Sequence, residues 1–115
     1  MLVHDIDSYQ HFTRTTAFYP EALHGNQQAL TYLALGLVSE AGEVADKLKK
    51  RMRDGCVDHT SWEIEVLREI GDVFWYAARI ADELGYQASV VLDINADKLT
   101  SRQDRGELGG SGDDR

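Results

Sequence analysis

A single proline, Pro20, interrupts this chain of 115 residues, which leaves two long stretches free to form continuous helices. From about Asn26 to Arg53, apolar residues recur at spacings of three, four and seven, the pattern of a helix that buries one face. The stretch from about Thr60 to Leu84 repeats this pattern, whereas runs with the alternation of a strand are poorly supported. The sequence therefore predicts an all-α fold dominated by two long helices.

Turn and capping residues indicate where helices begin. A short first helix is expected from Asp7 to Tyr19, with Asp7 or Ser8 as its N-cap and the proline directly after it. The third helix is expected to begin with a capping box, in which Thr60 and Glu63 satisfy each other's backbone N–H groups.

Glycines at the helix ends and a polar extension complete the expected organisation. Gly55 and Gly85 are expected to end the two long helices. A fourth helix is expected over residues 87–104, and its inward-facing residues would be Val91, Ile94 (or Val90) and Leu99. Residues 1–105 are expected to form one domain, and residues 106–115 a glycine-rich, acidic and mobile tail. Long helices usually pack in bundles, so a bundle of four to five helices is expected to assemble as a homodimer or homotetramer.

The composition excludes several classes of protein. The formal net charge of −8 argues against a nucleic-acid-binding protein, which normally presents a basic surface. Cys56 is the only cysteine, so neither an internal disulfide nor a cysteine-based zinc cluster is expected. No apolar run approaches the length of a membrane span, and the first residues lack the pattern of a signal peptide, so a cytoplasmic protein is expected.

Two matched pairs of carboxylates are the most informative feature of the sequence. Glu40-Ala-Gly-Glu43 lies in the second helix, and Glu69-Ile-Gly-Asp72 lies in the third. Residues three apart share one face of a helix, with their β-carbons roughly 5–6 Å apart. If the two helices pack antiparallel through their apolar faces, the two pairs face each other across the seam.

Such a gathering of acids favours a metal site. Carboxylates in a partly desolvated cleft repel one another unless they are protonated or bridged by cations. Oxygen ligands suit Mg²⁺, which shares its shell with substrate phosphates, and Mn²⁺ could substitute for it. Gly42 and Gly71 each cost about 1 kcal/mol inside a helix, which indicates close packing there. The alternative is that the acids are solvated, because a chain with 20 Asp and Glu residues contains some such pairs by chance.

The text around these acids resembles a known family. The resemblance is carried by LALGLVSEAGEVADKLKKRMRDG, EIGDVFWYAARIADELGY and NADKLTSRQDRGELGGSGDDR, with 25 residues between the two acidic motifs. These stretches are similar to the all-α MazG-like nucleotide pyrophosphohydrolases, relatives of the dimeric dUTPases. The resemblance implies Mg²⁺-dependent hydrolysis of an NTP or dNTP between its α- and β-phosphates, which yields a monophosphate and pyrophosphate and clears particular nucleotides from the pool.

The resemblance also implies roles for individual residues. The metal ligands would be the two acidic pairs, Glu40, Glu43, Glu69 and Asp72. Glu40 or Glu43 would orient or deprotonate the attacking water. Many members have a glutamate where this chain has Ser39, which leaves the number of metal ions open. Glu65, one turn before Glu69, could compensate or could be a solvated helix residue.

Basic residues near the end of the chain are candidates for contact with phosphate. Asn95, Lys98 and Arg102 resemble the family's C-terminal phosphate-contacting motif, and Arg105 continues the same helix face. They could serve the site of their own subunit or that of a neighbour. The alternative is a solvated basic face.

Other substrate contacts are expected beside the acids. Lys47 could contact a phosphate or pair with Glu43, and Tyr76 could reach the substrate or pack at the edge of the core. Trp75 is expected to point away from the acids as a packing or interface residue. Base recognition is expected from aromatic residues before the first motif, which are Tyr9, Phe12, Tyr19 and Tyr32.

Two other interpretations stay open. A non-catalytic helical interaction module could keep the acids for solubility or as a structural cation site. A hydrolase of a different phosphoanhydride would release orthophosphate instead of pyrophosphate.

Overall fold

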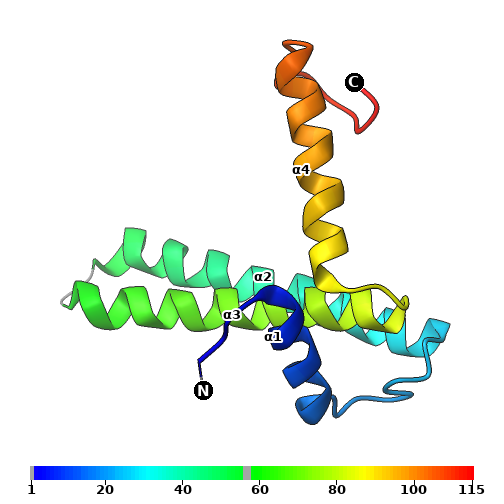
Figure 1. The fold of residues 1–115 in the computed structure, drawn as a ribbon. Coiled ribbons are helices and arrows are strands. Elements are labelled where there is room, and N and C mark those ends of the chain that lie inside the picture. Colours follow the sequence, from blue (N-terminus) through cyan, green and yellow to red (C-terminus); the bar gives the residue numbers. More distant parts are fainter. Residues whose placement is uncertain (1, 56–57) are drawn as a thin grey trace.

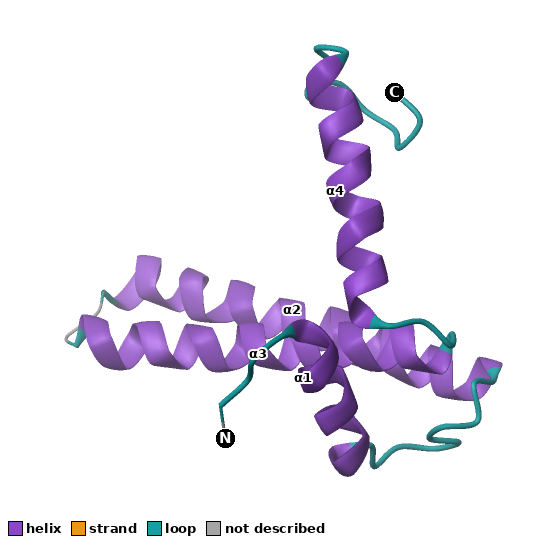
Figure 2. Ribbon diagram, in the orientation of Figure 1, coloured by secondary structure: helices purple, strands orange, loops and turns teal. Residues whose placement is uncertain are grey.

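Every regular element in the described part of the chain is helical (Figure 1 and Figure 2). The computed structural model describes residues 2–55 and 58–115, so Cys56 lies outside the described residues. The elements in order are α1 (Ile6–Thr13), the 3₁₀ turn η1 (Arg14–Thr16), α2 (Gln27–Asp54), α3 (His59–Glu83) and α4 (Ala88–Asp104). The predicted all-α class with two long helices is confirmed.

The two long helices form an antiparallel hairpin on which the other helices are arranged. α2 and α3 lie side by side along their length, and α1 packs across α3 (Figure 1). α4 starts at the end of α3 and projects away from the hairpin (Figure 1). The hairpin therefore brings together the two helices that carry the acidic motifs, while the basic residues of α4 lie on a separate helix, called the arm here.

The helix caps differ from the predicted ones. α3 is capped by Asp58, whose carboxylate accepts from the backbone N–H groups of Thr60 at 3.1 Å and Ser61 at 3.3 Å, instead of by the predicted Thr60–Glu63 box. Asn26 caps α2, and its side chain accepts a backbone hydrogen bond at 3.1 Å. The N-cap of α3 is therefore Asp58, two residues before the predicted Thr60.

α1 is shorter than predicted and begins at a different cap. Asp5, rather than Asp7 or Ser8, is the N-cap, and its carboxylate accepts from the backbone N–H of Ser8 at 2.7 Å. The helix ends at Thr13, so the chain is irregular from residue 17 to residue 26. The carboxylate of Asp7 is directed elsewhere, to α4.

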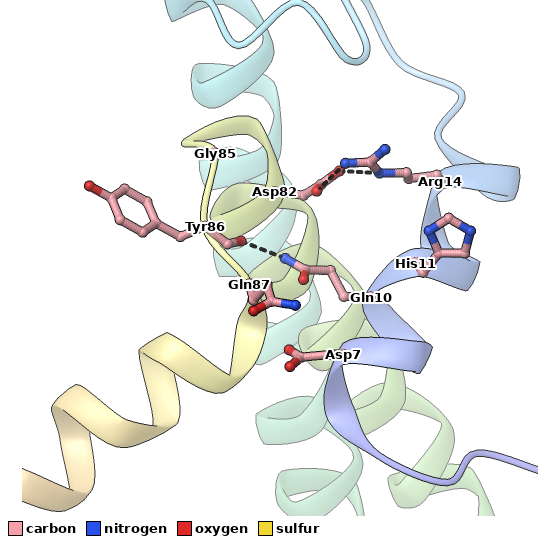
Figure 3. A pocket seen from close by; sticks show the side chains of 8 residues that line it. All are labelled: Asp7, Gln10, His11, Arg14, Asp82, Gly85, Tyr86 and Gln87. Carbon is pink, nitrogen blue, oxygen red and sulfur yellow. Dashed lines mark hydrogen bonds and ion pairs between the residues drawn. The ribbon is translucent and has the colours of Figure 1, made fainter.

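α1 holds the start of α4 through two side chains. The buried Gln10 donates from Nε2 to the main-chain oxygen of Tyr86 at 3.0 Å and accepts from the backbone N–H of Ala88 at 2.9 Å (Figure 3). Asp7 accepts from the backbone N–H of Ser89 at 2.8 Å. α4 lacks a cap from its own N-cap side chain, so these bonds satisfy its first N–H groups. A cavity of about 290 Å³ at this junction is lined by none of the predicted acidic metal ligands (Figure 3).

The buried apolar core is small. Its members are Tyr19, Ala29, Leu33, Ala78, Ala81 and Ala88. The prediction that Val91, Ile94 and Leu99 face inward is wrong, because they are 49%, 64% and 44% exposed on the projecting α4. Val90, the alternative to Ile94, is half-buried. Helical periodicity indicates that a face is apolar, but it does not indicate which surface covers it.

A buried ionic cluster ties the end of α3 to the loop of residues 17–26. Arg79 is fully buried, with Nη1 2.6 Å from Asp82 and Nη2 3.6 Å from Glu83. Glu83 also accepts from the hydroxyl of Tyr19 and from two backbone N–H groups of the loop, at 2.7 Å each. Burial alone would raise the pKa of Glu83, but these hydrogen bonds and the charge of Arg79 outweigh it, so its pKa is lowered.

Glu83→Gln is expected to destabilise the fold by about 3 kcal/mol, because it leaves the buried Arg79 with less opposing charge. Since the pKa of Glu83 is lower in the folded chain, its contribution is present at neutral pH and is lost as the pH falls through the lowered pKa. Urea unfolding at neutral and acidic pH measures both effects. Glu63→Gln, exposed on the same helix, is the control and should change stability by less than about 0.5 kcal/mol. Equal stability of the Glu83→Gln variant and the wild type would contradict this role.

Candidate metal centre

Three of the four predicted acids converge where α2 packs against α3. Glu40 comes from α2, Glu69 and Asp72 come from α3, and each offers a carboxylate oxygen within 4.8 Å of the other two. The antiparallel course of the two helices brings these acids together (Figure 1). The two i, i+3 motifs therefore supply one three-carboxylate cluster.

The cluster has the charge and the donor atoms of a cation site. Burial raises the pKa of Glu40, and the negative charges of Asp72, Glu69 and Glu43 raise it further. This shift means that the carboxylates repel one another, and a bound cation would relieve the repulsion. The three ligand atoms are all carboxylate oxygens, which suit a hard divalent ion such as Mg²⁺.

Glu43 lies outside this three-carboxylate cluster. It is exposed on α2, one turn after Glu40, and is not among the three acids whose oxygens converge. Its charge nevertheless acts on both Glu40 and Lys50, raising the pKa of each. Glu43 therefore contributes to the electric field of the cluster from its solvent side.

Lys47 lies at the edge of the cluster. Its Nζ is 3.8 Å from Glu69 Oε1 and 3.8 Å from Glu65 Oε2. Within the described residues, Lys47 therefore forms ion pairs with acids of α3 and not with Glu43. Ion pairs of this length contribute little to stability. Glu65 is directed at Lys47 and is not part of the three-carboxylate cluster.

A cavity of about 380 Å³ opens beside the acids. Its lining residues are Phe12, Thr16, Glu40, Asp72, Trp75 and Tyr76. Burial raises the pKa of Tyr76, as do the neighbouring Tyr32, Glu40 and Asp72. Tyr76 therefore packs against the core and also borders the candidate metal site.

Trp75 lines the same cavity, so the prediction that it points away from the acids is wrong. Its Nε1 donates to Thr16 Oγ1 at 2.7 Å, and its ring packs edge-on against Tyr19 and Tyr76, with centroids 6.2 and 4.9 Å away. Its predicted packing role is confirmed. Thr16 belongs to η1, so no spacing within α3 could have revealed this anchor.

The aromatic residues predicted to recognise a base have different positions. Phe12 lines the cavity beside the acids. Tyr19 is buried against the cluster of Glu83, and the ring of Tyr32 stacks on it at 5.7 Å. Burial raises the pKa of Tyr9, and the charge of Asp72 adds to this effect. Phe12 therefore lies beside the acids, whereas Tyr19 and Tyr32 stack on each other.

The glycines near the acids differ in what surrounds them. A β-carbon on Gly36 would lie 2.1 Å from Cε1 of Tyr76, so the tyrosine ring packs directly on the backbone of α2. A β-carbon on Gly42 or Gly71 would meet nothing within 4 Å. The predicted close packing at Gly42 and Gly71 is therefore not found within the described chain.

Gly36→Ala is expected to displace the ring of Tyr76 and to destabilise the protein by about 2 kcal/mol. Gly42→Ala is the matched control, because the added methyl group meets open space and better helix propensity should stabilise the protein by up to about 1 kcal/mol. Thermal unfolding of both variants tests this contrast. A Gly36→Ala variant as stable as the wild type would mean that Tyr76 is free to move.

The basic residues of α4 are not brought to the acids of their own chain. α4 projects away from the hairpin, and Asn95 is exposed on it (Figure 1). Lys98 and Arg102 contact Asp113 of the tail, at 3.2 and 3.4 Å. Arg105 pairs with Glu107.

None of the helices in the described ranges combines the length and apolarity needed to cross a bilayer.

A family model for the MazG nucleotide pyrophosphohydrolase domain matches residues 27–106. The chain is 42% identical over 113 residues to the Gene 37 protein of Mycobacterium phage L5, which covers 96% of this chain and 98% of that protein. No solved structure matches the chain. The matched span includes both acidic motifs and α4, and the chain belongs to the MazG nucleotide pyrophosphohydrolase family.

Proposed function

We propose that this protein is a Mg²⁺-dependent nucleoside triphosphate pyrophosphohydrolase. It would hydrolyse an NTP or dNTP between the α- and β-phosphates and so control the nucleotide pool. The observation that carries the proposal is the convergence of Glu40, Glu69 and Asp72 beside an aromatic-lined cavity, in a chain of this family.

The acids divide the chemical work. Glu40, Glu69 and Asp72 would hold Mg²⁺, with Mn²⁺ as a substitute, and the ion would supply neutralisation of phosphate charge and a lowered pKa for a bound water. Glu43, exposed beside them, accepts a proton from the attacking water. The water oxygen bonds to the α-phosphorus, and the bond from that phosphorus to the α–β bridging oxygen breaks. The products are a nucleoside monophosphate and pyrophosphate.

The nucleoside is proposed to occupy the aromatic side of the cavity. Trp75 is fixed there by its hydrogen bond to Thr16, and Phe12 is 38% exposed at the same cavity. Flat aromatic surfaces favour stacking with a base or packing against a sugar. Tyr76 would contact the substrate between this wall and the acids.

The site is proposed to be completed by a second copy of the chain, in a homodimer or homotetramer. The small core and the exposed apolar residues of α4 support assembly, because monomeric proteins rarely leave a large apolar surface uncovered. The projecting position of α4 favours contact of its basic residues with a neighbouring copy's site (Figure 1). Those basic residues are Lys98 and Arg102, and the amide of Asn95 would join them. Lys47 would contact phosphate from within its own subunit.

A panel of standard and modified nucleoside triphosphates, incubated with the protein and Mg²⁺, tests the proposal. The expected products are a monophosphate and pyrophosphate, which ion-exchange chromatography separates from orthophosphate. Release of orthophosphate would favour another phosphoanhydride hydrolase. No product from any substrate would leave a non-catalytic helical module with a structural cation site.

A further inference from the structure

The tail of residues 106–115 folds back onto the end of α4 (Figure 1). Asp113 Oδ1 accepts a hydrogen bond from Lys98 Nζ at 3.2 Å and lies 3.4 Å from Arg102 Nη2. Arg102 Nη2 also donates to the main-chain oxygens of Gly112 at 3.0 Å and Asp113 at 2.8 Å. An acid of the same chain therefore engages the two α4 cations that are proposed to contact phosphate.

Arg102 has an unused donor in this arrangement. The residue is only 5% exposed, although most of its neighbours on α4 are exposed. Its Nε is buried and has no hydrogen-bond partner among the described residues. A buried donor without an acceptor is destabilising. A phosphate group, with several oxygens on one centre, can accept from Nε and Nη2 together, which the tail does not do.

We propose that the tail is an autoinhibitory strap over an anion-binding site formed by Lys98 and Arg102. Asp113 stands in for a phosphate oxygen between the two cations, and it must leave before pyrophosphate or the polyphosphate of a nucleotide binds there. The anion site stands on the contacts described above. Its consequence for turnover rests on the proposed function.

The strap is suited to release. Gly106 and Gly112 hold φ at +70° and +86°, values that favour glycine, so the path of the tail depends on these residues. The side chain of Asp113 is 83% exposed. The hydrogen bond from Lys98 and its charge, followed by those of Arg102, lower the pKa of Asp113, so the carboxylate is ionised at neutral pH. The Lys98–Asp113 pair is exposed, and exposed ion pairs are weak, so a multiply charged anion can displace the carboxylate of Asp113 from Lys98.

Pyrophosphate binding to the whole, metal-free chain tests the strap by isothermal titration calorimetry at constant ionic strength. Asp113→Asn removes the competing charge and is expected to tighten binding by about two- to fivefold, because the apparent Kd falls as the open fraction rises. Asp114→Asn is the matched control, since Asp114 is exposed and makes no ion pair within the described chain. Its affinity should equal that of the wild type.

A second variant separates the site from general charge effects. Adding Lys98→Ala to Asp113→Asn is expected to remove the gain in affinity. Equal tightening in the Asp113→Asn and Asp114→Asn variants would overturn the proposal, and so would a gain that survives the loss of Lys98. The calorimetry needs neither metal nor turnover. An unchanged affinity with normal hydrolysis would therefore refute only the strap, whereas the expected affinities without any hydrolysis would refute only the proposed enzyme.

Discussion

Asp72→Asn is expected to abolish nucleotide hydrolysis while leaving the helices intact. The substitution keeps the shape of the side chain but removes one of three converging carboxylates. Loss of a metal ligand removes several kcal/mol of transition-state stabilisation, so the rate should fall by at least about a thousandfold. Initial rates with Mg²⁺ and circular dichroism measure the two parts of this result.

Stability gives the same variant a second, independent signature. The repulsion that raises the pKa of Glu40 is relieved, so the metal-free Asp72→Asn variant should melt at a higher temperature than the wild type. Mg²⁺ should raise the Tm of the wild type, because it binds only the folded chain, and should leave the variant unchanged. Glu63→Gln, an exposed acid on the same helix, is the control and should keep both the rate and the Mg²⁺ response. Activity that survives in Asp72→Asn would remove Asp72 from the metal shell.

The same two measurements separate a ligand from a base. Glu43→Gln is expected to lose turnover and to retain the Mg²⁺-dependent rise in Tm, because Glu43 lies outside the three converging acids. Loss of that rise would instead make Glu43 a direct metal ligand.

Mixing two variants that are each defective in hydrolysis is expected to restore activity. Asp72→Asn removes one carboxylate of the three-carboxylate cluster. The double substitution Lys98→Ala and Arg102→Ala removes the two cations of α4, and this double variant is called the arm variant. A mixed dimer contains one site with intact acids from one copy and an intact arm from the other. If subunits exchange freely and half of the dimers are mixed, about a quarter of the wild-type activity should return. Refolding the two variants together and assaying them below the KM measures this recovery.

The control for this experiment is each variant refolded alone. The arm variant should lose about ten- to a hundredfold in kcat/KM, because two charge-assisted hydrogen bonds are removed. If α4 served the acids of its own chain, the mixture would give only the mean of the two separate activities. Light scattering on the refolded samples establishes that the mixture contains assembled dimers.

The helices could be predicted because their signals are local. Apolar spacing defined α2 and α3, and Gly55 and Gly85 follow them with φ of +77° and +85°. The caps of α1 and α3 could not be predicted, because several polar residues precede each helix and more than one can accept hydrogen bonds from the first turn. Asp58 was preferred to Thr60, since its carboxylate reaches two backbone N–H groups of the first turn.

The site could be predicted only where its residues follow the i, i+3 spacing of a helix. Glu40, Glu69 and Asp72 were found from their spacing and from the antiparallel course of α2 and α3. The position of Trp75 depends on Thr16, which is 59 residues away in the sequence. The exposure of the α4 residues depends on the direction of the whole helix, and no periodicity encodes that direction.

That direction is set at the other end of the chain. Gln10 and Asp7 accept hydrogen bonds from the first turn of α4. The eight-residue α1 therefore fixes the direction in which the 17-residue α4 projects. In an assembly where α4 contacts a neighbouring copy, α1 would set the distance between the acids of one copy and the α4 residues of the other. Substitutions of Gln10 or Asp7 would thus change that distance without altering any residue proposed to contact the nucleotide.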